Sequence, residues 1–273
     1  MICSVSKLGL GTMGTRTMSL WSNDPLERLQ TARMLSPNEA AEHQSALVES
    51  SPIKPWPYGM PTTINPFLVI LGPSPGNSPA KRDVDTDPKP TVGKAHPGFF
   101  YHDTKKYWER VRELSAGLIQ AYAPELTPED CYALSGQMNL SVSESGQAIK
   151  VKIEREYAKW VPEVIANLLR PRLVILLGLL GLMKNNQDLQ DTFASSGAIP
   201  IDWKRPDCKL PFRGYIGRQQ YFYRIWKISR PDGANMTIIS WPNHPSRPPM
   251  TNAAVWGASI DESTKWCVRR TLH

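Results

Sequence analysis

Short, continuous apolar runs indicate an α/β protein. Residues 67–71 (FLVIL) and 173–177 (LVILL) each end at a glycine, and residues 236–240 (MTIIS) form a third run. Such runs are typical of strands buried on both faces of a parallel sheet. Residues 131–142 are expected to contain one more strand. The pattern predicts a central four-stranded, mainly parallel sheet.

Helical spacing of apolar residues appears between these runs. Tyr107, Val111, Leu114 and Leu118 recur at helical intervals behind Asp103, a suitable N-cap. Further helices are expected over residues 153–169, with an interruption at Pro162, and from Asn252 onward. Strands that alternate with helices predict a three-layer αβα architecture, whose ligand site lies beyond the carboxyl ends of the strands.

Two segments fall outside this core pattern. Residues 1–60 form an N-terminal extension with one helical stretch, from about Asp24 to Leu47, which either packs on the main domain (residues 61–273) or stays mobile. Residues 221–228 (YFYRIWKI) alternate as an extra strand does, and we expect a hairpin with residues near Phe212.

The charge of the chain favours a polyanionic partner. The 273 residues carry a formal net charge of +7, which suits nucleic acid but serves solubility equally well. The four cysteines are scattered without metal-ligand spacing, so neither a metal nor an iron–sulfur cluster is expected. No secretion signal is apparent, and the most apolar stretch is too short to cross a bilayer. These features predict a cytoplasmic protein.

Two motifs match well-known patterns in an unsuitable context. Gly9, Gly11 and Gly14 fit the dinucleotide fingerprint, but no buried strand precedes them. Residues 72–76 (GPSPG) fit the nucleophile elbow of α/β-hydrolases, with Ser74 as nucleophile. Because Pro75 follows Ser74 directly, the strained turn into a helix is disfavoured. The hydrolase remains an alternative.

Three polar segments lie at the ends of predicted strands: residues 72–79 (GPSPGNSP), 138–146 (MNLSVSESG) and 241–246 (WPNHPS). Their order resembles the uracil-DNA glycosylase superfamily, with its Gly- and Pro-rich first loop, its base-reading Asn and its final His-Pro-Ser loop. The resemblance covers about residues 62–260. It implies the glycosylase-like αβα fold and a monomeric, cofactor-free enzyme that excises a base from double-stranded DNA and leaves an abasic site.

The resemblance assigns roles to the matched residues. Gly72 and Gly76 would let backbone N–H groups approach an extruded nucleotide. Asn139 would read the base through its amide, although taken alone it would more simply bind its own turn. His244 would donate a hydrogen bond to the base oxygen as negative charge develops there, rather than cap the last helix.

Further residues would contact the DNA. Ser246 would hold a phosphate, while Arg247 and Met250 would enter the groove or fill the gap left by the flipped base. Phe99 and Phe100 would stack on the base, although a place in the core explains them equally well.

The first loop departs from the superfamily at the position that orients the attacking water. Ser74 stands there, and a serine hydroxyl is too weak a base to deprotonate water. Asn77 is one substitute, and a carboxylate from Asp83, Asp85 or Asp103 is another. A dissociative reaction, with His244 stabilising the leaving base, is the third.

The long, Pro-rich first loop resembles the antiphage branch of the superfamily, which excises glucosylated hydroxymethylcytosine from phage DNA. Residues 212–227 would then form either a pocket wall for a large modified base or a plain structural hairpin. Uracil excision in DNA repair is the alternative substrate assignment. A noncatalytic DNA-binding protein is the alternative of another class.

Overall fold

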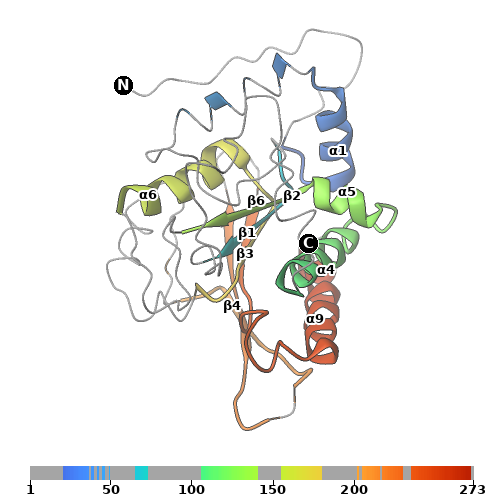
Figure 1. Cartoon of the computed structure of the whole chain (residues 1–273), viewed down its shortest axis with the longest axis vertical. Helices are drawn as coiled ribbons and strands as arrows, with labels where there is room; N and C mark the ends of the chain where they lie inside the picture. Colours follow the sequence, from blue (N-terminus) through green and yellow to red (C-terminus); the bar gives the residue numbers. More distant parts are fainter. Residues whose placement is uncertain are drawn as a thin grey trace.

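The computed structural model describes residues 21–36, 65–72, 106–140, 155–179, 205–215, 217–229 and 235–271, together with a few single positions. These residues form one six-stranded mixed sheet with helices on both faces (Figure 1).

The sheet has the strand order β2-β1-β3-β6-β5-β4. Strands β2, β1, β3 and β6 run parallel to one another, and β5 runs antiparallel to both of its neighbours, β6 and β4. The strands are β1 (Leu68–Gly72), β2 (Ser135–Asn139), β3 (Leu173–Leu176), β4 (Cys208–Pro211), β5 (Phe222–Ser229) and β6 (Asn235–Ser240). The α/β class is confirmed, but the expected hairpin extends the central sheet, which therefore has six strands rather than four.

Two apolar clusters cover the two faces of the sheet. In β1, Leu68 and Ile70 belong to one cluster, while the alternating Val69 and Leu71 belong to the other. This alternation follows the two-residue period of a strand. The first face carries α4 (Lys106–Gln120), α5 (Pro128–Ala133) and α9 (Ala253–Thr271), and the opposite face carries α6 (Arg155–Glu163) and the π-helix η2 (Val164–Leu169) (Figure 1).

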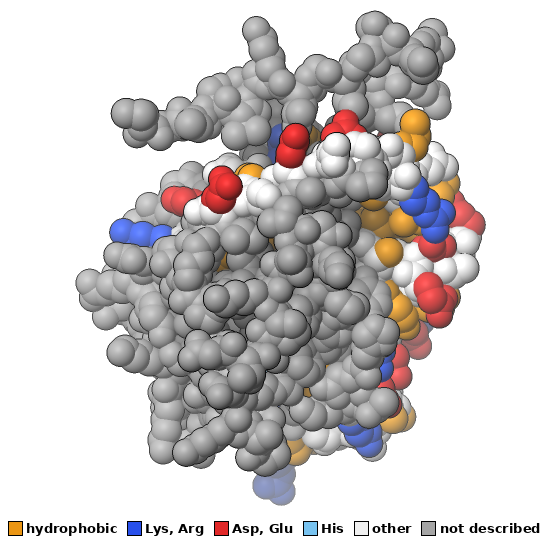
Figure 2. Space-filling view, turned by 45° about the horizontal axis from the view of Figure 1, so that its top comes forward, with side chains coloured by type: hydrophobic (Ala, Val, Ile, Leu, Met, Phe, Trp, Pro, Cys, Tyr) orange, Lys and Arg blue, Asp and Glu red, His pale blue; other side chains and the backbone are white. Residues whose placement is uncertain are grey.

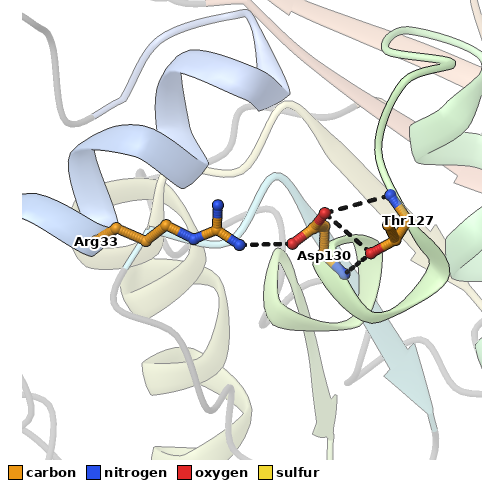
Figure 3. A network of polar contacts seen from close by, with 3 residues as sticks. All are labelled: Arg33, Thr127 and Asp130. Atoms are coloured by element: carbon orange, nitrogen blue, oxygen red, sulfur yellow. Dashed lines mark hydrogen bonds and ion pairs between the residues drawn. The ribbon is translucent and has the colours of Figure 1, made fainter.

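Helix α5 corrects the predicted boundary of the second strand. Residues 131–142 were expected as strand, yet α5, which begins after the N-cap Thr127, extends to Ala133, and β2 begins only at Ser135. The Thr127 hydroxyl accepts a hydrogen bond from the Asp130 N–H, and the Asp130 carboxylate accepts one from the Thr127 N–H. Asp130 also binds Arg33 at 2.7 Å (Figure 3). This exposed ion pair contributes at most about 1 kcal/mol.

Helix α1 (Pro25–Met34) packs on the domain through a buried arginine. Arg28 donates hydrogen bonds to the carbonyl oxygens of Pro66 at 2.7 Å and Arg170 at 2.9 Å. Burial, and then the nearby Arg170 and Arg172, lower the pKa of Arg28 to about 9. The helical stretch expected from Asp24 to Leu47 is not continuous, because the backbone turns extended at Leu35. Beyond this break the described residues between Asn38 and Glu49 are helical again.

Pro162 does not interrupt its helix as expected. It lies inside α6, and the chain continues as the π-helix η2 from Val164. Pro162 lacks the N–H that would bind the preceding turn, and the regular α-helix ends one residue after it, at Glu163. In the described part of the chain, no helix combines the length and apolar character needed to span a membrane.

Candidate functional site

Four parallel strands end at one edge of the sheet, and two polar side chains converge there. Asn139 is the last residue of β2, and His244 follows β6 by four positions. The intervening strands β1 and β3 end near Gly72 and Gly178. The carboxyl edge of parallel strands is where ligand sites of α/β folds lie.

Asn139 leans over the end of β1. The strand register places Gly72 opposite Asn139, and a Cβ atom on Gly72 would lie only 2.7 Å from Asn139 Oδ1. Glycine is therefore needed here for space. Asn139 is 5% exposed. Its side-chain amide carries both hydrogen-bond donors and an acceptor.

His244 leans over the end of β3. A Cβ atom on Gly178 would lie 3.0 Å from His244 Cδ2, and Gly178 has a φ of +71°, which only glycine adopts readily. Because β1 and β3 are adjacent, Asn139 and His244 lean toward neighbouring strands about 4.8 Å apart.

Hydrogen bonds within its loop fix the tautomer of His244. The Ser246 N–H donates to His244 Nδ1 at 3.1 Å, so Nδ1 is unprotonated and a neutral ring carries its proton on Nε2. The Asn243 side chain joins two parts of the loop. Its Oδ1 accepts a hydrogen bond from the His244 N–H, and its Nδ2 donates one to the Pro248 carbonyl, both at 2.8 Å. The imidazole therefore presents a fixed N–H donor.

Burial, and secondly the positive charge of Arg247, lower the pKa of His244 from 6.5 to about 4. The ring is consequently neutral at physiological pH. Between about pH 6.5 and 4 the unfolded chain binds a proton that the folded chain does not. The contribution of this residue to stability is therefore complete above pH 6.5 and is lost as the pH falls through that window.

We expect nitrogen-detected NMR at pH 6 to show His244 as the neutral Nε2–H tautomer. The same titration should give a midpoint near pH 4 in the wild type. In the Arg247→Ala variant the midpoint should rise, because a neighbouring positive charge has been removed. A midpoint near the ordinary value of 6.5 in the wild-type protein would contradict the buried, neutral assignment.

Helix α4 supports the histidine and its loop. The Tyr107 ring stacks on His244 with a centroid distance of 5.4 Å and an interplanar angle of 11°. One turn later, the buried Arg110 donates to the carbonyl oxygens of Pro245 and Thr251, each at 2.5 Å. The loop is thus held at both ends by one side chain.

Tyr107 also connects the two halves of the site. Gln137 Nε2 donates to the Tyr107 hydroxyl at 3.4 Å, and Gln137 shares the α4-facing side of β2 with Asn139. Burial raises the pKa of Tyr107 to about 12, so its hydroxyl stays protonated. Gln137 Oε1 is buried without a partner in the described structure. An amide flip would let Tyr107 donate to it.

The amino-acid pattern does not mark all of these supporting residues. It places Tyr107 only on the apolar face of a helix and Gly178 only at a strand end. Arg110 carried a signal, because it falls on the same helical face as Tyr107 and Leu114 and a charged residue there needs buried partners. Gln137 carried no comparable signal.

The structure brings together Gly72, Asn139 and His244, and it leaves Ser246 and Arg247 exposed beside them. Met250 is a correction, because it is fully buried in the cluster against α4 and α9 and cannot fill a gap in DNA from there. The other predicted site residues lie outside the described residues: Ser74, Gly76, Asn77, Phe99 and Phe100.

Similarity to known proteins does not identify the function of this site. The chain matches no model of a known protein family and no curated protein sequence. Within the described residues, no three His, Cys, Asp or Glu side chains gather as metal ligands would. The chemistry of the site therefore has to be argued from Asn139, His244 and their supports.

Proposed function

We propose that this protein is a monofunctional DNA glycosylase that flips a modified pyrimidine out of double-stranded DNA and hydrolyses its glycosidic bond. One observation carries the proposal. A neutral imidazole with its N–H fixed on Nε2 and a buried Asn amide lie over the ends of two adjacent strands, β3 and β1, at the carboxyl edge of the sheet.

Each group suits one part of the reaction. The Asn139 amide offers a donor and an acceptor, as needed to read the edge of a pyrimidine. When the bond between C1′ and the base nitrogen breaks, its electrons move onto the base. The Nε2–H of His244 stabilises the charge on the base oxygen without giving up its proton, and such a fixed donor in a dry site acts as an oxyanion hole does.

Water completes the balance of the reaction. Its oxygen forms the new bond to C1′, one of its protons reaches the departed base, and the sugar remains as an abasic site. Asn77 or one of Asp83, Asp85 and Asp103 would orient this water, or the bond breaks before water adds. His244 itself is no base here, because the Ser246 N–H occupies Nδ1 and Nε2 is protonated.

We propose glucosylated hydroxymethylcytosine as the substrate base, with antiphage defence as the role. The proposal rests on the likeness of the long, Pro-rich first loop to the antiphage branch, the bacteriophage replication inhibition DNA glycosylases. Uracil is the second candidate, because an Asn amide can pair with either pyrimidine by rotating through 180°.

The deciding experiment compares three substrates. Purified protein is incubated with uracil-containing DNA, ordinary DNA and glucosylated phage DNA, and released bases and abasic sites are measured. We expect release from the glucosylated DNA alone. Tight binding without any release would instead favour a noncatalytic DNA-binding protein. Esterase activity that Ser74→Ala abolishes would favour the α/β-hydrolase.

A further inference from the structure

The β4–β5 hairpin points to the same edge of the sheet as the candidate site. Strand β5 runs antiparallel to β6 and pairs Arg224 with Ser240, the last residue of β6. Phe222, and with it the turn between β4 and β5, therefore lies beyond the carboxyl end of β6, from which the His244 loop also emerges. Figure 1 shows this hairpin projecting past the sheet beside the segment that leads into α9.

Contacts with α9 hold the turn of the hairpin in place. Phe212 is buried in the core, and its N–H donates to the Tyr221 carbonyl at 2.8 Å. The Glu262 carboxylate accepts the Arg213 N–H at 2.9 and 3.0 Å. Gly214 sits so close to Ala258 that a Cβ atom would lie 2.8 Å from the alanine methyl group. These contacts fix the end of β4 and the first residues of the turn, 212–214, against α9.

The hairpin is strongly basic. Residues 208–229 contain five Lys and Arg and no Asp or Glu: Lys209, Arg213, Arg218, Arg224 and Lys227. Arg213 and Arg218 are exposed on the turn, and Tyr215 is 36% exposed between them. The described residues visible in Figure 2 differ from the hairpin, because acidic and basic side chains are mixed on that face of the molecule.

We infer that the β4–β5 turn is a second DNA-binding surface, on which Arg213 and Arg218 bind phosphates of the duplex that flanks the flipped nucleotide. Guanidinium groups bind phosphate through paired N–H donors, and an exposed tyrosine between them can lie along sugar or base. The inference rests on the proposed function, because it assumes that a duplex bound at the candidate site continues past the β4–β5 turn. It adds an anchoring point separate from the His244 loop.

The test measures DNA binding without any chemistry. The affinity of the full-length protein for an unmodified 20-base-pair duplex is measured against salt concentration for the wild type and for Arg213→Gln/Arg218→Gln. We expect binding to weaken about tenfold or more at 0.1 M salt, and the slope of log affinity against log salt to fall by about 1.8. Lys159→Gln/Lys265→Gln removes the same charge from exposed positions of α6 and α9 and should change the slope little.

Other outcomes separate the two proposals. If the hairpin variant binds with wild-type affinity and slope, or if the control variant loses as much, the hairpin inference is wrong, whatever the base-release assay shows. If the wild type binds anionic lipid vesicles and no duplex, the inference also fails. Wild-type base release from modified DNA tests the proposed function independently, because it requires neither arginine to be changed.

Discussion

Replacing His244 with alanine is expected to slow base release about 10²- to 10³-fold while leaving DNA affinity nearly unchanged. The imidazole is fixed by Ser246 and Tyr107 as a neutral donor, and removing one such donor from a charge-stabilising site costs about this factor. The measurement is single-turnover base release with saturating enzyme, together with a binding isotherm on the same duplex.

A graded variant separates chemistry from folding. His244→Gln keeps an N–H donor of similar reach, so it should retain more activity than His244→Ala. Both variants should unfold near the wild-type temperature, because Arg110 and Asn243 still hold the loop without the imidazole. Wild-type release rates in His244→Ala would exclude the donor role, and the function would then need another catalytic group.

Replacing Gly72 with alanine should reduce kcat/KM about 10- to 100-fold with a small change in stability. The added methyl group would lie 2.7 Å from Asn139 Oδ1 and would have to push the amide away. A misplacement of about 1 Å in a positioning group can cost about 10²-fold in rate. Gly257→Ala is the matched control, because a Cβ atom there meets nothing within 4 Å. It should leave activity intact and favour its helix slightly.

A double-mutant cycle tests whether Gly72 acts through Asn139. If it does, Gly72→Ala should cost little once Asn139→Ala is present, because the two residues share one interaction. Additive losses would show that Gly72 acts otherwise, for example through its own backbone. Full activity in Gly72→Ala alone would count against Asn139 as the base-reading residue.

The sequence predicted the strands well because apolar runs report burial directly. Strands β1, β3 and β6 lie within about one residue of the runs that indicated them. It failed where a local capping interaction overrides the apolar pattern, as at Thr127, where α5 replaces expected strand. The predicted number of strands in the sheet was also wrong. Alternating apolar residues indicate a hairpin, but they cannot show whether its strands form a separate sheet or pair with β6.

The site was predicted in part for a similar reason. Asn139 and His244 are marked by their places at the end of one predicted strand and just after another, which the sequence shows. Their supports act across the fold: Gly178 beneath His244, and Tyr107 and Arg110 from α4. Such contacts depend on which helix covers which strand end. Met250 looked like a wedge from its distance along the loop, but the fold turns it into the core.

The loop that Arg110 and Asn243 hold has its shape before any nucleotide arrives. Its ordering entropy is lost during folding and need not be lost again on binding. Closure of this loop is therefore a poor device for telling one base from another. The protein would instead select a base by how easily its nucleotide leaves the duplex, because a weakly paired or unstacked nucleotide is extruded at a lower free-energy cost. Bases in mismatches or frayed ends would then be captured faster than the same base in a stable helix.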